Sequence, residues 1–131
     1  MSPPGGVLAD TCVWIEYFRT TSKISEELKA LIREGRLVTT GVVLLELIHG
    51  VRSPQTKKII EETLLALPFL ESTADTWMAA GEMGYMLRRK GITLPATDLL
   101  VAAVAKINAC ALFTTDSHFE HIPELQIHAV P

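Results

Sequence analysis

Residues 7–18 read VLADTCVWIEYF, and this stretch decides the fold. Its first three residues, Val-Leu-Ala, form a short apolar run after a segment of Pro and Gly, as expected for a buried strand of a parallel sheet. From Thr11 onward the apolar side chains change to helical spacing, with Trp14, Ile15 and Phe18 on one side. Asp10 therefore stands where a strand is predicted to end and a helix to begin.

The rest of the chain continues this alternation of short apolar runs and helical patterns. Further strands are predicted over residues 37–40, 68–70, 111–115 and 126–130, the last of them at an edge of the sheet. Helices are predicted over residues 22–34, 41–49, 54–66, 73–90 and 95–108, and a turn or short helix over 116–121. Strands that alternate with helices imply an α/β fold, in which three layers, α/β/α, surround a short, mostly parallel central sheet of about four to five strands.

The helical patterns also predict how some elements pack. The helix over residues 41–49 is apolar on every side, which is typical of a buried helix. In the helix over residues 73–90 we expect Trp77 and Met78 in the core, although this helix can instead form a dimer face. The first two helices of the chain are expected to form an antiparallel pair.

Size and composition indicate a single domain over residues 1–131, with 48% hydrophobic and 21% charged residues. No apolar run reaches the roughly 18 to 20 residues that span a bilayer, and the first residues do not form a signal peptide. Two distant cysteines favour free thiols over a disulfide framework, so we expect a cytoplasmic location and no membrane partner. The net charge of −3 does not decide between partners, because it becomes +1 without four acids that form a candidate site.

These four acids are Asp10, Glu46, Asp98 and Asp116, and three of them have an ordinary structural alternative. Asp10 and Asp98 are placed to cap helices, and Asp116 follows a predicted strand where it can form an Asx turn. Glu46 is harder to explain, because it interrupts an apolar helix and a carboxylate is rarely buried without a partner. An ion pair of Glu46 with Arg52 or His49 is the structural alternative.

The placement of the four acids as a set indicates a common site. Two of them follow strands, and the other two lie early in helices that are entered from strand ends. In open parallel sheets, ligands bind beyond the carboxyl ends of the strands. Carboxylates gathered there repel one another unless a cation neutralises them, and an all-oxygen ligand set favours Mg²⁺ or Mn²⁺. The predicted chemistry is metal-assisted hydrolysis of a phosphodiester, in which an ion positions and activates water.

Four motifs in sequence order then resemble a known family. They are DTCVWI at residues 10–15, ELIHG at 46–50, DLLVAA at 98–103 and LFTTDSHF at 112–119. Together, over about residues 7–130, they resemble the PIN domain, specifically the VapC-type toxins of bacterial and archaeal toxin–antitoxin pairs. The resemblance implies a PIN-like fold and an Mg²⁺- or Mn²⁺-dependent endoribonuclease that cleaves RNA by water attack, leaving a 5′-phosphate and a 3′-hydroxyl.

The resemblance also implies roles and partners. Asp10, Glu46, Asp98 and Asp116 correspond to the catalytic, metal-holding acids, and the Thr115 hydroxyl corresponds to a group that organises the site. Such proteins usually form homodimers and are inhibited by a VapB-like antitoxin, which binds DNA, so this chain is expected to reach DNA only through the antitoxin. Besides the RNA substrate itself, the expected contacts of RNA or antitoxin are to Arg52, Trp14 and Phe18, with Trp14 and Phe18 having the core as their alternative.

Two positions depart from the family pattern. Cys12 stands where relatives often have a serine or asparagine, so a hydrogen bond near the first acid is expected to be lost or weakened. His118 stands where many relatives carry another acid, so the sequence supports one metal ion and leaves a second open. Thr11, Thr115 and His118 are expected to support the site, and His118 can be a ligand, a phosphate contact or a surface residue.

Two other classes of protein share part of this pattern. A haloacid-dehalogenase-like phosphatase also begins with a strand that ends in Asp-Thr, but it needs an acid where this chain has Cys12. The non-enzymatic alternative is a catalytically weak PIN-like module that binds RNA or a partner without cleaving it. A binding module has little physical need for four gathered acids, which favours the enzyme.

Overall fold

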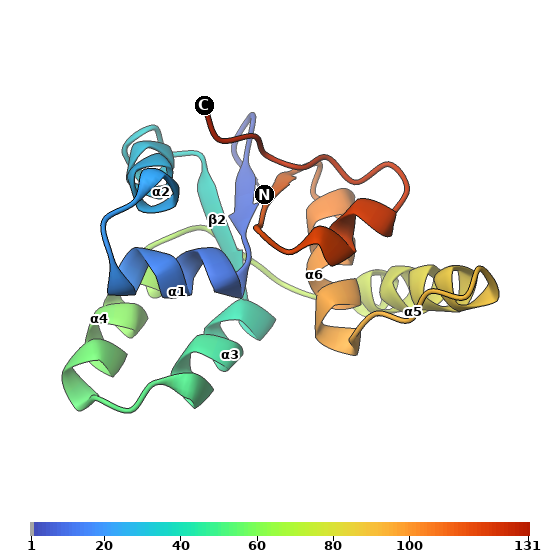
Figure 1. The fold of residues 1–131 in the computed structure, drawn as a ribbon, viewed down its shortest axis with the longest axis horizontal. Helices are drawn as coiled ribbons and strands as arrows, with labels where there is room; N and C mark the ends of the chain where they lie inside the picture. The colour runs from blue at the N-terminus through green and yellow to red at the C-terminus, as the bar shows by residue number, and fades with distance from the viewer. Residues whose placement is uncertain (1) are drawn as a thin grey trace.

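The computed structural model describes residues 2–131 and shows a parallel sheet between helices (Figure 1). Its four strands lie in the order β3-β2-β1-β4, and every pairing is parallel. The strands span Val7–Ala9 (β1), Leu37–Thr40 (β2), Phe69–Leu70 (β3) and Ala111–Phe113 (β4). The predicted α/β class with a short parallel central sheet is therefore confirmed.

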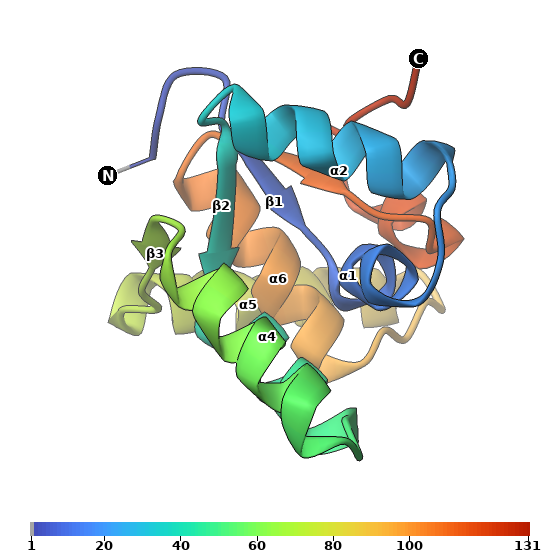
Figure 2. The ribbon, with the colours of Figure 1, turned by 90° about the vertical axis from the view of Figure 1, so that its left-hand side faces the viewer.

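Helices cover both faces of this sheet (Figures 1 and 2). They are α1 (Thr11–Arg19), α2 (Lys23–Arg33), α3 (Gly41–Gly50), α4 (Pro54–Leu65), α5 (Ala74–Arg89) and α6 (Ala96–Ile107), followed by the short 3-10 helix η1 (Ser117–His121). Helices α1, α2 and α4 lie on one side of the sheet, and α6 lies on the other with α5 outside it. None of the helices within residues 2–131 is both long and apolar enough to cross a membrane.

The central strand β1 explains why the first stretch of sequence decides the fold. All three of its residues are fully buried, because β1 has a paired strand on each side and helices on each face. Ala9 pairs with Phe113 at the carboxyl end of β4, and the Asp10 amide then donates to the Phe113 carbonyl at 2.9 Å. The residues after β1 and those after β4 thus emerge side by side at one edge.

Helix ends follow the predicted capping chemistry. The sequence offers Ser22 or Ser25 as the cap of α2, and the structure has Ser22 there. The Ser22 hydroxyl accepts from the Ser25 amide, and the Ser25 hydroxyl accepts from the Ser22 amide in return. Thr73 caps α5 in the same reciprocal arrangement with Thr76. Gly91, which follows the C-cap residue Lys90 of α5, has a φ of +82°, the left-handed conformation in which helices often end.

Several packing expectations were wrong. The predicted edge strand over 126–130 is one parallel bridge between Leu112 and Ile127, because only two backbone hydrogen bonds connect this segment to β4. Helix α3 is not buried on every side: Val43 and Leu47 are buried, whereas Leu45 is 65% exposed. Helices α1 and α2 cross instead of running antiparallel, since α1 is seen end-on in Figure 2 while α2 runs across the view.

The expectation of core positions in α5 was also wrong. Trp77 and Met78 are 59% and 72% exposed, and Tyr85 and Met86 are exposed as well. The reason is that α5 packs mainly on α6, which lies between it and the sheet, so much of the outer surface of α5 stays uncovered. An apolar surface of this extent on a helix is typical of a protein contact.

Ala109 gives a test of backbone strain at the end of α6. It has a φ of +53°, which is unfavourable for a residue with a Cβ atom. We expect Ala109→Gly to raise the free energy of unfolding by about 1 kcal/mol, measured by urea denaturation. Ala66→Gly is the control, because Ala66 ends α4 with a φ of −82°, and there glycine should lower stability by about 0.5–1 kcal/mol. Equal effects of the two substitutions would contradict the assignment of strain.

Candidate active site

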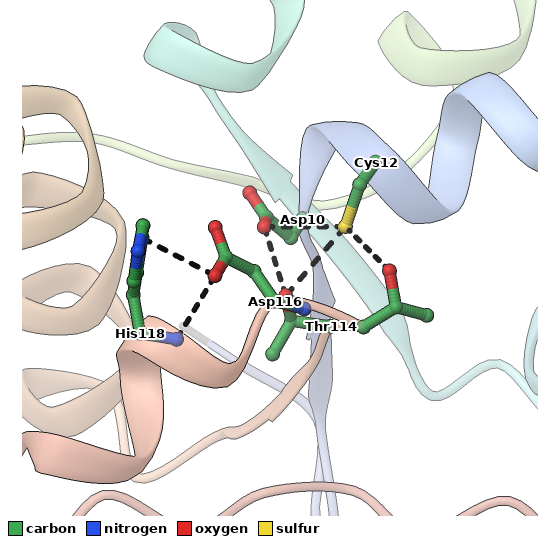
Figure 3. Close-up of polar contacts among 6 residues, drawn as sticks. Asp10, Cys12, Thr114, Asp116 and His118 are labelled. Atoms are coloured by element: carbon green, nitrogen blue, oxygen red, sulfur yellow. Dashed lines mark hydrogen bonds and ion pairs between the residues drawn. The ribbon is translucent and has the colours of Figure 1, made fainter.

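Asp10 is both a helix cap and the most firmly held acid of the site (Figure 3). Its Oδ1 accepts a hydrogen bond from the Thr11 amide at 2.8 Å, and its Oδ2 accepts one from the Thr114 hydroxyl at 2.9 Å. The Cys12 thiol also donates to Oδ2 at 3.4 Å. The sequence predicted that the hydrogen bond at position 12 is lost or weakened. It is present, and it is a weak one, because a thiol is a weaker donor than a hydroxyl.

Thr114 connects the first acid to the last. While its hydroxyl donates to Asp10, it accepts a hydrogen bond from the Asp116 amide at 3.0 Å. Thr115, which the resemblance pointed to, is exposed and donates to the Cys12 sulfur at 3.4 Å. The sequence offered two adjacent threonines, and only the register of β4 shows that Thr114 faces Asp10.

Glu46 reaches the same edge from the middle of α3. Its Oε1 accepts a hydrogen bond from the Thr11 hydroxyl at 2.7 Å, so Thr11 contacts both Asp10 and Glu46. Within the described part of the chain, no basic side chain lies at ion-pair distance from Glu46. The ion pair with Arg52 or His49 is therefore not formed.

Asp98 and Asp116 complete the set of acids, and His118 joins them. One ligand atom from each of these three residues lies within 4.8 Å of the other two. The Asp116 Oδ1 accepts from the His118 amide at 2.9 Å and lies 3.3 Å from the His118 Nδ1. The ring of His118 consequently turns toward Asp116 (Figure 3).

The charges of the four acids act on one another. The pKa of Asp98 is raised from 3.8 to about 6. Burial is the largest cause, the carboxylates of Asp10, Asp116 and Glu46 add to it, and His118 acts in the opposite direction. All four predicted acids therefore share one electrostatic environment. A divalent cation bound among them would relieve this repulsion, and carboxylate oxygens with one imidazole nitrogen are suitable ligands for it.

Comparison with known proteins agrees with this arrangement. The family model of the PIN domain matches residues 7–125. The chain belongs to the PIN domain family. Two similar curated proteins are the VapC ribonuclease Mb1587 of Mycobacterium bovis and the ribonuclease VapC11 of Mycobacterium tuberculosis, each 29% identical over 124 residues that cover 91% of this chain and 92% of the relative. Among solved structures, this PIN domain matches that of VapBC2 from Rickettsia felis bound to a DNA fragment from their promoter. The TM-score is 0.80 at 21% identity, and the match covers 93% of this chain and 96% of that chain. This match supports the fold.

The residues expected to contact RNA or antitoxin lie in different settings on this PIN domain. Trp14 is fully buried, so its ring belongs to the core and is not exposed to a partner. Phe18 is half-buried and lines a hollow of about 300 Å³ between α1, α3 and α4, with Glu46 at its wall. Arg52 is exposed just after α3 and does not line this hollow.

The two threonines after β4 form a matched pair for testing the site. Thr114→Val removes the hydroxyl that donates to Asp10 and accepts from the Asp116 amide, so we expect Mn²⁺ affinity, measured by calorimetry, to fall by about 10- to 100-fold. Thr115→Val should change it by less than about twofold, since that hydroxyl donates to the Cys12 sulfur, which is a weak acceptor. The reverse order of effects would show that Thr115 organises the site.

The raised pKa of Asp98 predicts how stability depends on pH in metal-free protein. The folded state disfavours the charged carboxylate, so Asp98 lowers the free energy of unfolding above pH 6. This destabilisation disappears as the pH falls from 6 toward 3.8, because the carboxyl group is then protonated in both states. The two-unit shift corresponds to about 3 kcal/mol, which solvent screening at this half-buried group reduces to about 1 kcal/mol. With chelator present, Asp98→Asn should therefore raise Tm by about 4 °C at pH 7.5, and the gain should shrink toward pH 5.

The control for this measurement is Asp75→Asn, which changes an exposed carboxylate in the first turn of α5. Asp75 is not among the charges that act on Asp98. It should bring no gain in Tm at pH 7.5. A gain from Asp98→Asn that is the same at pH 5 and pH 7.5 would contradict the raised pKa.

Proposed function

We propose that this chain is a metal-dependent endoribonuclease that hydrolyses RNA phosphodiester bonds and acts as the toxin of a toxin–antitoxin pair. The observation that carries the proposal is the convergence of four acids on one edge of a PIN domain, where three of them raise the pKa of the fourth. Relatives that cover nearly the whole chain are named as ribonucleases, which supports RNA as the substrate.

Asp10, Glu46, Asp98 and Asp116 are the residues that would hold Mg²⁺ or Mn²⁺. A bound ion supplies positioning and activation of water and stabilises charge that develops at phosphorus. Asp10 keeps a fixed orientation through its hydrogen bonds from Thr11 and Thr114. Thr11 also holds one oxygen of Glu46, which leaves the other oxygen to accept a hydrogen bond from the attacking water.

The partner we propose is a VapB-like antitoxin. The hollow beside Glu46 is lined by Ile15, Phe18, Leu47 and Ile60, with Arg19 at its margin. Apolar walls next to an anionic site suit an amphipathic segment whose basic side chain reaches the acids. Contact with promoter DNA would then come through the antitoxin. The solved complex of VapBC2 from Rickettsia felis is bound to a DNA fragment from their promoter.

A homodimer is the second proposed association. The exposed side chains of Leu45 on α3 and Trp77 on α5 line one shallow hollow with Phe69 of β3 between them. This apolar surface is suitable for a second copy of the chain. A cytoplasmic location accords with the two free cysteines.

A cleavage assay tests the proposed function. Purified chain freed of antitoxin is incubated with structured RNAs and Mg²⁺ or Mn²⁺, and the RNA ends are sequenced. Asp10→Asn or Asp98→Ala should lower the cleavage rate by at least about 100-fold, because each removes a charge that holds the ion. Asp75→Asn should leave the rate unchanged.

The same variants distinguish the enzyme from a binding module. Expression of the chain should arrest growth unless its antitoxin is present, and Asp98→Ala should relieve the arrest. Cleavage that persists with chelator, or RNA retention without products at any metal concentration, would overturn the proposed mechanism.

A further inference from the structure

The acid cluster has two unlike halves. On the side of β1 and α3, hydrogen bonds already occupy much of the carboxylate surface: Asp10 accepts three of them and Glu46 accepts one. All of these donors are side chains or amides of residues 11–12 and 114. This half is organised by hydrogen bonds before any ligand binds.

On the side of α6 and η1, the carboxylates of Asp98 and Asp116 accept fewer hydrogen bonds. Within residues 2–131 the carboxylate of Asp98 has no hydrogen-bond partner, although burial and three other carboxylates disfavour its charge. Asp116 offers Oδ1 to the His118 amide, and its Oδ2 has no hydrogen-bond partner among residues 2–131. One ligand atom from each of Asp98, Asp116 and His118 lies within 4.8 Å of the other two. The distance between Asp116 Oδ1 and His118 Nδ1 is 3.3 Å.

This spacing suits a small divalent ion bound by nitrogen and oxygen. Bonds of about 2.0–2.1 Å to a tetrahedral ion place neighbouring ligand atoms about 3.4 Å apart, close to the observed separation. Imidazole nitrogen is a good ligand for zinc and other transition metals, whereas magnesium prefers oxygen and water. The position of His118 therefore bears on which metal the cluster selects.

We propose that His118 is a metal ligand, and that with Asp98 and Asp116 it makes this half of the cluster selective for a divalent transition ion over Mg²⁺. The inference rests on the proposed function, since the acids are those of the proposed nuclease site. Affinity should follow the order Mn²⁺ < Co²⁺ < Zn²⁺, with Mg²⁺ weakest.

The alternative role of His118 is a surface ion pair. Its side chain is 57% exposed and that of Asp116 is 37% exposed, so a protonated imidazole there would contribute little to stability. In that case replacing the ring would change the affinities for all metals alike or not at all. Selectivity between metals, measured without RNA, therefore distinguishes a ligand from an ion-pair partner.

The test measures metal binding to the full chain, free of antitoxin, by calorimetry with Zn²⁺ and Mg²⁺ and by the visible absorption of bound Co²⁺. His118→Asn should lower Zn²⁺ and Co²⁺ affinity by at least about tenfold, and it should leave Mg²⁺ affinity within about twofold. The retained Mg²⁺ binding also shows that the variant is folded. His121→Asn is the matched control, because His121 is an exposed histidine on the same helix η1 and should change neither affinity.

A second variant restores an oxygen ligand. His118→Asp should weaken Zn²⁺ binding relative to the unchanged chain while it keeps or strengthens Mg²⁺ binding, and the Co²⁺ spectrum should shift because a nitrogen ligand is lost. Unchanged Zn²⁺ affinity in His118→Asn, an equal loss in His121→Asn, or a parallel loss of Zn²⁺ and Mg²⁺ would each overturn the proposal.

Failure of this inference is distinguishable from failure of the proposed function. If Zn²⁺ affinity does not depend on His118 but RNA is cleaved with Mg²⁺ in an Asp10-dependent manner, the proposed nuclease function is supported and His118 is not a metal ligand. If Zn²⁺ affinity depends on His118 but no metal supports cleavage of RNA, the selective metal site is supported and the proposed nuclease function is rejected.

Discussion

Four carboxylates held at the carboxyl edge of a parallel sheet repel one another, and the surrounding structure has to oppose that repulsion. The effect of this repulsion is seen at Asp98, whose pKa rises to about 6 through its burial and the charges of the other three acids. Backbone geometry sets the distances, because β1 and β4 are paired and their following residues emerge together. Hydrogen bonds then stabilise the charge on Asp10 but not on Asp98. Function and folding thus make opposing demands on the same few residues, and a bound cation is the simplest way to satisfy both.

The fold meets these demands with rigid elements and few polar groups. All three residues of β1 are fully buried, and β1 is paired on both sides. The position of Asp10 at the end of this strand is therefore fixed. Thr114 ties the ends of β1 and β4 together by accepting from Asp116 while donating to Asp10. Beyond the site, the apolar surfaces of α3 and α5 and the hollow between α1, α3 and α4 provide places where a second copy and an inhibitory segment could bind.

The sequence was sufficient to predict the helices and strands and the gathering of four acids at one place, and it was insufficient for much of the packing. Buried parallel strands and capped helices depend on local patterns, such as the apolar run at β1 and the serine cap of α2, and these were predicted within a few residues. Burial of a helix depends on its neighbours, which periodicity does not contain: α3 and α5 are apolar yet leave Leu45 and Trp77 exposed. The choice between Thr114 and Thr115 depended on strand register, a property of the pairing of β4 with β1. The segment 126–130 has the composition of a strand, but it forms one bridge to Leu112.

The central claim is that the four acids act as one electrostatic unit that a divalent cation neutralises. It is tested most directly by carbon NMR titration of the Asp98 carboxyl group, in metal-free protein, with Mg²⁺, and in the variant Asp10→Asn. The account predicts a pKa of about 6 for Asp98 without metal, and a lower pKa both when Mg²⁺ is added and when the charge of Asp10 is removed. A pKa near the ordinary value of 3.8 that neither Mg²⁺ nor Asp10→Asn changes would contradict it.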